Sequence, residues 1–149
     1  MDPTGRSIAL IADDDADIRD VLSMVVGGLG LEPVLAEDGR QAVQVLATLH
    51  PEIILLDVQM PGLSGIEVCW WIRRQRHLAR VPVVLVSART SPFEIDAGLL
   101  AGANQYVTKP FTPAQIVAVV NQLRRGRPTA RPTLRPPTAV VIPDLDPQR

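Results

Sequence analysis

The chain has 149 residues, of which 46% are hydrophobic and 21% are charged, and its net charge is −1 at pH 7. This composition is typical of a folded protein, and the balanced charge argues against general binding to nucleic acids or membranes. Cys69 is the single cysteine, which excludes an internal disulfide and a cysteine-based zinc site. The sequence shows neither a basic leader with an apolar core nor a run of about 18 apolar residues, so we expect a cytoplasmic protein without membrane contact.

Short apolar runs alternate with helical patterns along most of the chain. The runs predict strands at residues 8–12, 33–36, 53–57, 82–87 and 105–108. After each run, apolar residues recur at helical spacing, and Asp15 and Ser91 are candidate N-caps. Five strands that alternate with five helices predict right-handed crossovers, a parallel sheet and helices on both of its faces.

From Gly126 onward the composition changes to loose Arg-Pro-Thr repeats, and six of the last 23 residues are proline. Proline-rich sequence favours extended polyproline II and does not build a core. We therefore predict a folded domain over residues 7–125 and a Pro/Arg/Thr-rich flexible tail or linker over residues 126–149.

The helix predicted from Gly65 contains an adjacent tryptophan pair, Trp70 and Trp71. Neighbouring helical residues point about 100° apart, so we expect at least one of the two rings to be partly exposed. An exposed ring there would form a contact patch for a partner or a second copy. On the same helix we expect three cations to face solvent: Arg73, Arg74 and Arg76.

Polar side chains stand at or directly after the ends of four of the five predicted strands: Asp13 and Asp14 at the first, Asp57 at the third, Ser87 at the fourth and Lys109 at the fifth. Because the carboxyl ends of parallel strands meet at one edge of a sheet, we expect these side chains to converge. Three close carboxylates repel one another unless a cation neutralises them. Because these side chains offer only oxygen ligands, the cation that fits is Mg²⁺.

Lys109 is the only lysine, since the other fourteen cationic residues are arginines. Its ammonium group is a compact charge suited to a point contact with phosphate. A carboxylate beside Mg²⁺, with a lysine and a hydroxyl opposite, can accept a phosphoryl group by in-line attack. This chemistry makes Asp57 the candidate acceptor.

The stretch from Ser7 to Arg125 resembles the receiver domain of two-component response regulators. Four motifs in the same order carry the resemblance: Asp13-Asp14, Leu55-Leu56-Asp57-Val58-Gln59-Met60-Pro61 with Gly65, Ser87-Ala88, and Tyr106-Val107-Thr108-Lys109-Pro110-Phe111. The resemblance implies a flavodoxin-like (βα)5 fold, in which a five-stranded parallel sheet has the order 2-1-3-4-5.

The resemblance also implies a role for each site residue. Asp57 would take a phosphoryl group from a phosphohistidine on a sensor histidine kinase or a phosphotransfer protein. Mg²⁺ would be held by Asp14, Asp57 and the backbone carbonyl of Gln59, with Asp13 acting largely through water. Lys109 would pair with the acyl phosphate, and its bond to Pro110 would be cis. Ser87 would turn toward the phosphate, and Tyr106 would fill the space that Ser87 leaves.

A receiver of this kind is a phospho-acceptor and not an enzyme, beyond a slow autodephosphorylation. Gln59 and Arg89 stand at positions that vary in the family and tune the phosphoryl lifetime. Phosphorylation would remake the face formed by the fourth helix, the fifth strand and the fifth helix, which would then bind a downstream protein or a second copy. The sequence contains no helix-turn-helix or basic recognition helix after the receiver, so we expect no direct DNA binding.

The sequence leaves two alternatives open. Asp13 and Asp15 have the Asp-x-Asp spacing of haloacid-dehalogenase-like phosphohydrolases, in which Asp13 would be the nucleophile and Asp57 only a metal ligand. The second alternative is a receiver that is never phosphorylated and serves only as a docking module. The presence of every site residue argues against it.

Overall fold

A computed structural model describes residues 5–125, and the strands and helices alternate in it as the sequence predicts. The tail predicted for residues 126–149 lies outside the described residues. In chain order the elements are β1 (Ile8–Ala12), α1 (Ala16–Gly28), β2 (Glu32–Ala36), α2 (Gly39–Leu46), β3 (Ile53–Asp57), α3 (Gly65–Arg74), the short 3-10 helix η1 (Arg76–Leu78), β4 (Val83–Ser87), α4 (Pro92–Leu100), β5 (Gln105–Thr108) and α5 (Pro113–Arg125). The sequence did not predict η1.

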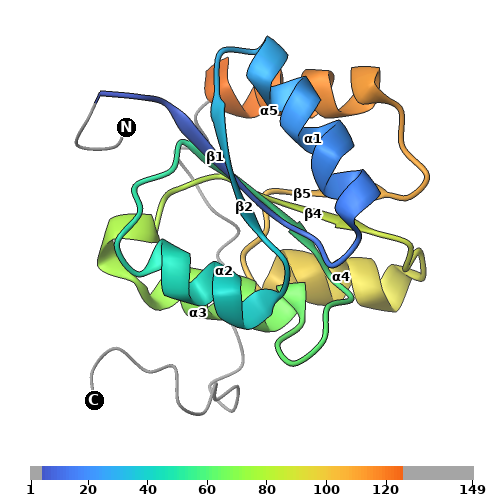
Figure 1. Ribbon diagram of the computed structural model, residues 1–149. Helices are drawn as coiled ribbons and strands as arrows, with labels where there is room; N and C mark the ends of the chain where they lie inside the picture. Colours follow the sequence, from blue (N-terminus) through green and yellow to red (C-terminus); the bar gives the residue numbers. More distant parts are fainter. Residues whose placement is uncertain (1–4, 126–149) are drawn as a thin grey trace.

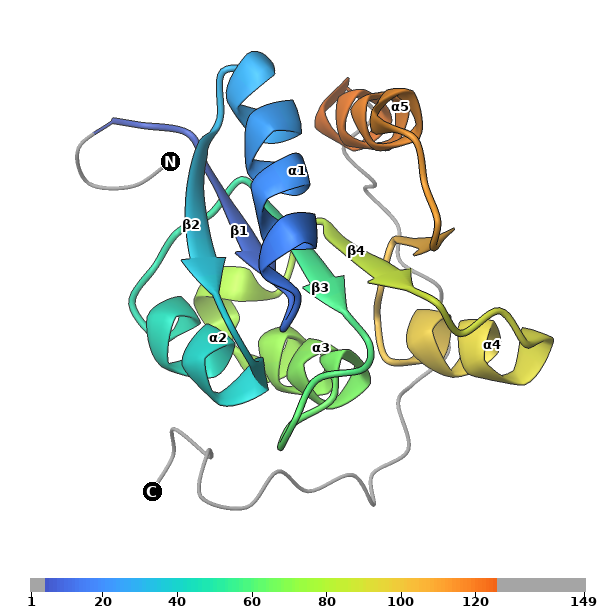
Figure 2. The same cartoon turned by 45° about the vertical axis from the view of Figure 1, so that its right-hand side comes forward.

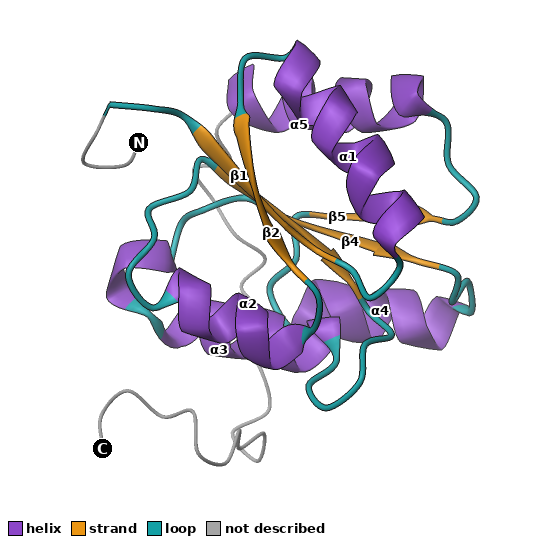
Figure 3. Cartoon of the chain, in the orientation of Figure 1, coloured by secondary structure: helices purple, strands orange, loops and turns teal. Residues whose placement is uncertain are grey.

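All strand pairs are parallel, and the sheet has the order β2-β1-β3-β4-β5, which confirms the expected topology. Helices α1 and α5 cover one face of the sheet, and α2, α3 and α4 cover the other (Figure 1 and Figure 2). Figure 3 shows the strands as the middle of three layers. No helix within residues 5–125 has the length and apolar character of a membrane span.

The three central strands β1, β3 and β4 are buried along their whole length, because helices cover both of their faces. Successive side chains of a strand point to opposite faces, so Leu10 joins the core under α2 and α3 while Ile11 joins the core under α1 and α5. Continuous apolar runs are the sequence pattern of strands buried in this way.

Polar side chains cap the helices that begin at the carboxyl edge of the sheet. Asp15 accepts a hydrogen bond from the Asp17 backbone N–H at 2.9 Å, and Ser91 accepts one from the Glu94 N–H at 3.2 Å. At the start of α3, Ser64 and Glu67 form a reciprocal capping box. Each cap contributes about 0.5–2 kcal/mol of helix stability. The caps fix the loops in which the polar site residues lie.

The tryptophan pair is buried, so the prediction of an exposed contact patch at Trp70 and Trp71 is wrong. Trp70 is 8% exposed and Trp71 is 4% exposed, and both belong to the larger core cluster. The physical reason is that α3 has neighbours on several sides: α2 and α4 flank it, η1 follows it and β4 lies against it. A helix enclosed in this way buries residues that point 100° apart.

Arg73 also departs from the expectation, because it is half-buried and does not face solvent. Its Nη1 donates to the Val81 carbonyl at 2.7 Å, and its Nε donates to the Gly102 carbonyl at 2.9 Å. Its Nη2 donates to Asn104 Oδ1, also at 2.9 Å. Arg73 therefore joins the end of α3 to the loops before β4 and β5, while Arg74 and Arg76 are exposed as expected.

Candidate functional site

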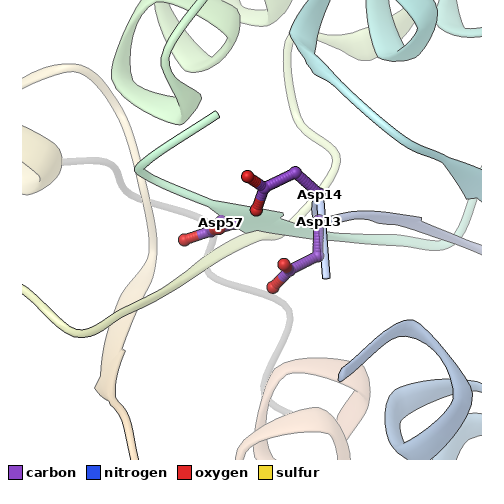
Figure 4. A group of neighbouring side chains, drawn as sticks. All are labelled: Asp13, Asp14 and Asp57. Carbon is purple, nitrogen blue, oxygen red and sulfur yellow. The ribbon is translucent and has the colours of Figure 1, made fainter. Parts of the chain in front are cut away.

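Asp13, Asp14 and Asp57 meet at the carboxyl edge of the sheet. Strands β1 and β3 are neighbours, and Ala12 pairs with Leu56, which brings the residues that follow them together. One oxygen atom of each carboxylate lies within 4.8 Å of the others, and Figure 4 shows the three side chains gathered at the strand ends. Asp13 is 1% exposed and Asp57 is 5% exposed, whereas Asp14 is open to solvent. The sequence prediction of an acidic cluster is thus matched by the geometry.

Lys109 reaches this cluster from the end of β5. Its Nζ lies 2.9 Å from Asp13 Oδ2, with which it forms a hydrogen bond, and 3.5 Å from Asp57 Oδ1. The Lys109 backbone N–H donates to the Ser87 carbonyl at 2.7 Å, which ties the end of β5 to the end of β4. The Lys109–Pro110 peptide bond is cis, as expected.

Burial raises the pKa of Asp57 to about 6, and the negative charge of Asp13 adds to the rise. Lys109 and the hydrogen bond from the Gln59 N–H act in the opposite direction and only partly offset it. One ammonium group therefore does not compensate for three carboxylates. Three carboxylate oxygens at this separation, with a single ammonium group to balance them, suit a hard divalent cation.

The pKa of Lys109 lies above its ordinary value. Burial acts to lower it, but the hydrogen bond to Asp13 and the negative charges of Asp57 and Asp13 outweigh the burial. Lys109 is therefore a permanent cation in this site at neutral pH. A protonated lysine beside a buried carboxylate is suited to pair with the oxygens of a phosphate group.

Ser87 and Tyr106 are both connected to Arg89 in the loop between β4 and α4. Ser87 is fully buried, and its Oγ accepts a hydrogen bond from the Arg89 N–H at 3.0 Å. The half-buried Tyr106 donates its hydroxyl to the Arg89 carbonyl at 2.7 Å. The backbone of one residue thus links the hydroxyl and the aromatic ring that the sequence singled out.

The side chain of Arg89 extends across the mouth of the site to Gln59. The Gln59 amide oxygen, oriented toward the guanidinium, accepts hydrogen bonds from Arg89 Nη2 and Nε, each at 2.9 Å. Arg89 Nη1 also lies 3.4 Å from Glu94 Oε1 at the start of α4. These three side chains line a cavity beside Asp14. The sequence named both Gln59 and Arg89, but it did not predict that they touch.

The family model for the response regulator receiver domain matches residues 9–121 of the chain. The chain belongs to this family. Its membership explains why four separate strand ends carry the polar residues described above.

Curated relatives of this receiver domain include the DNA-binding response regulator MtrA of Mycobacterium tuberculosis, which is 38% identical over 124 residues, or 83% of this chain and 53% of the relative. The phosphate regulon transcriptional regulatory protein PhoB of Escherichia coli is 38% identical over 116 residues, or 78% of this chain and 51% of the relative. The chain thus spans about half the length of the curated relatives that it matches.

Solved structures agree with the fold of the receiver domain. The chemotaxis response regulator CheY4 of Vibrio cholerae superposes with a TM-score of 0.75 at 28% identity, covering 79% of this chain and 98% of that chain. A putative response regulator from Chloroflexus aurantiacus gives a TM-score of 0.76 at 31% identity, covering 80% of this chain and 98% of that chain. Both are receiver-type folds of nearly the same size as the described domain.

Gly65 holds the loop that follows Asp57 close to the start of α3. A Cβ atom at this position would overlap the backbone carbonyl of Asp57 and press on the Cα of Val58. The Gly65 N–H donates to the Val58 carbonyl at 2.9 Å, which closes the loop on the start of α3. Only glycine permits this approach, so Gly65 fixes the backbone from which the Asp57 side chain extends.

Arg19 is a site neighbour that the sequence analysis did not single out. Its Nη1 donates to the Asp13 carbonyl at 2.6 Å, and its Nη2 lies 3.9 Å from Glu37 Oε1. A cation in the first turn of a helix opposes the helix dipole. The local sequence pattern carries no signal for this contact, because the loop before α1 sets which carbonyl the long Arg19 side chain reaches.

Proposed function

We propose that Asp57 of this receiver accepts a phosphoryl group from a phosphohistidine on a sensor histidine kinase or a phosphotransfer protein. The observation that carries the proposal is the placement of a buried carboxylate between two further acids and a lysine at the carboxyl edge of the sheet. Membership of the receiver family supports the same assignment.

The residues of the acidic cluster fit Mg²⁺. Asp14 and Asp57 would bind it directly with the backbone carbonyl of Gln59, and the buried Asp13 would act largely through water. The raised pKa of Asp57 supports this assignment, because a bound cation would offset the burial and the neighbouring negative charge that raise it. When bound, the ion supplies positive charge that offsets the phosphoryl oxygens.

In the transfer step an Asp57 carboxylate oxygen forms a bond to phosphorus while the bond between phosphorus and the donor imidazole nitrogen breaks. The imidazole leaves with the electron pair. The Lys109 ammonium, now 3.5 Å from Asp57, pairs with the phosphoryl oxygens. Ser87 turns its hydroxyl from the Arg89 N–H toward the phosphoryl group, and Tyr106 follows into the space that it leaves.

The bridge between Gln59 and Arg89 limits the access of water to the acyl phosphate. The receiver is therefore a phospho-acceptor with slow autodephosphorylation and no separate substrate. Residues 7–125 form this unit, and residues 126–149 serve as a tail or linker. Both belong in the cytoplasm, where phosphohistidine donors are found.

The output face of the receiver is formed by α4, β5 and α5. Its apolar character supports this role, because Phe93 on α4 is 82% exposed and Leu99 and Leu100 of the same helix are each 36% exposed. Exposed large apolar side chains on one helix are typical of a protein-binding surface. The signal passes by contact with a downstream protein or a second copy, and not by contact of these residues with DNA.

Incubation with acetyl phosphate and Mg²⁺ tests the function. We expect the intact mass of the chain to rise by one phosphoryl group, and we expect Asp57→Asn and omission of Mg²⁺ to abolish the rise. Steady turnover of a free phosphomonoester would contradict the proposal in favour of a phosphohydrolase. If Asp57→Asn lost Mg²⁺ binding while the wild-type chain never gained phosphate, the chain would be a docking receiver.

A further inference from the structure

The only two histidines of the sequence lie next to each other, away from the acidic cluster. His50 lies in the loop between α2 and β3, and His77 lies in η1, which precedes β4. Both positions are at the amino ends of strands, opposite the edge that carries Asp57. The ring centroids are 5.3 Å apart and the ring planes meet at 66°. The fold thus brings two separate segments together at a pair of imidazoles.

The tautomer of His77 follows from its hydrogen bond. Its Nε2 lies 2.9 Å from the backbone carbonyl of Leu46. A carbonyl has no proton to donate, so Nε2 carries the proton and Nδ1 carries the lone pair in the neutral ring. Metal-binding histidines are commonly oriented in this way, by donation of the other ring N–H to a backbone carbonyl.

The separation of the two rings suits a shared ion. Histidine nitrogen lies about 2.0–2.1 Å from a bound zinc ion, which places the centres of two imidazoles on one tetrahedral ion about 5 Å apart. The observed separation of 5.3 Å agrees with this value. Both histidines are exposed, so an ion reaches them from solvent and water completes its coordination.

We propose that His50 and His77 form a second metal site, which binds a transition-metal ion such as Ni²⁺, Cu²⁺ or Zn²⁺. Imidazole nitrogen selects these ions, whereas the carboxylates at the opposite edge select Mg²⁺. The site joins the loop after α2 to η1. It does not depend on the function proposed for Asp57.

Isothermal titration of the full untagged chain with Ni²⁺, in the presence of saturating Mg²⁺, tests this site. An excess of Mg²⁺ competes with Ni²⁺ for carboxylate oxygens and leaves the imidazoles free. We expect one Ni²⁺ per chain, and we expect His50→Ala and His77→Ala each to weaken binding at least tenfold. Arg76→Ala removes an exposed neighbour without imidazole, so we expect it to bind Ni²⁺ as the wild-type chain does.

His50→Ala is the decisive variant, because His77→Ala also removes the hydrogen bond to Leu46 and so changes the loop. Line broadening of both imidazoles by Ni²⁺ in NMR spectra gives an independent measurement on the unchanged chain. The proposal would be overturned if His50→Ala bound Ni²⁺ with wild-type affinity or if the wild-type chain bound no Ni²⁺. Broadening of only one of the two rings would overturn it as well.

Discussion

At the scale of single residues, Asp57 combines burial, neighbouring negative charge and a lysine partner. Burial and the charge of Asp13 raise its pKa to about 6 despite Lys109. In the absence of a divalent cation, an ionised Asp57 therefore lowers the stability of the folded domain at neutral pH. The fold keeps this unfavourable group beside two further acids and a lysine.

This cost has a defined pH dependence. Asp57 holds its proton more tightly in the folded chain than in the unfolded chain, where its pKa is about 3.8. Its stabilising contribution is thus fully present below about pH 4 and is lost as the pH rises through about 6. Without Mg²⁺, we expect Asp57→Asn to be more stable than the wild-type chain by about 1–3 kcal/mol at pH 7.5, and equally stable near pH 4. Urea unfolding with a chelator measures both values, and a pH-independent difference would contradict the account.

Gly65 permits a second prediction at this scale. We expect Gly65→Ala to destabilise the domain by about 1–3 kcal/mol, because the added Cβ meets the backbone of Asp57 and Val58, which cannot move aside cheaply. Phosphoryl uptake should also slow, since the same backbone carries the acceptor. Gly28→Ala is the matched control, because a Cβ there has no atom within 4 Å. Equal thermal unfolding of the two variants would refute the role of Gly65.

The sequence predicted the residues of the acidic cluster because each one lies at the carboxyl end of a strand or within two residues of it, and strand ends are fixed by the sheet. The sequence did not predict the contacts of Arg73 and Arg89. Long arginine side chains reach partners set by tertiary packing, such as Gly102 and Gln59. Their direction does not follow from the local pattern.

At the scale of elements, the loop from β4 to α4 connects the separate parts of the site. Through Arg89 it contacts Ser87 and Tyr106 with backbone atoms, and Gln59 and Glu94 with side-chain atoms. A movement of Ser87 thus removes a hydrogen bond from the same residue that holds Tyr106. The loop therefore joins the end of β4 and Gln59, which follows β3, to β5 and the start of α4.

We expect Arg89→Ala to shorten the phosphoryl lifetime on Asp57 roughly three- to tenfold, a change of about 1 kcal/mol in the barrier to hydrolysis. The variant loses the bridge to Gln59 and admits water, but it keeps both backbone hydrogen bonds. The decay of the phosphorylated chain, followed by intact mass after removal of the donor, measures the lifetime. Arg74→Ala, on the exposed side of α3, is the control. An unchanged or longer lifetime in Arg89→Ala would show that the bridge does not shield the acyl phosphate.

Arg73 tests the packing of α3 against its neighbours. We expect Arg73→Ala to lower the free energy of unfolding by about 2–4 kcal/mol, because the carbonyls of Val81 and Gly102 would lose a charged donor. Arg74→Ala should change it by less than about 0.5 kcal/mol, as is usual for surface substitutions. Chemical denaturation of both variants provides the comparison, and similar losses in the two would mean that the contacts of Arg73 contribute little.

The burial of both tryptophans shows why a helical period was a poor guide for α3. A single apolar face is expected only where one side of a helix meets the core. From Val68 to Ile72 the sequence is apolar without interruption, which is typical of a helix buried on several sides. That uninterrupted apolar run was the feature of the sequence that indicated burial of both tryptophans.

At the scale of the whole molecule, the alternation of strands and helices predicted the three layers, since right-handed crossovers place helices on both faces. Alternation alone does not determine which strands are neighbours. The order 2-1-3-4-5 came from the resemblance to receivers, and the structure confirms it. The sequence also did not predict that His50 lies beside His77, because this contact depends on how two segments pack at the edge of the sheet opposite the acidic cluster.

The function proposed above requires Asp57 to carry the phosphoryl group. Borohydride reduction of the chain after treatment with acetyl phosphate and Mg²⁺ marks an acyl phosphate, and fragmentation of the resulting peptides locates the mark. We expect it on Asp57 alone, with none on Asp13 or Asp14. A mark on Asp13, or continued labelling of the Asp57→Asn variant at its wild-type extent, would contradict the account.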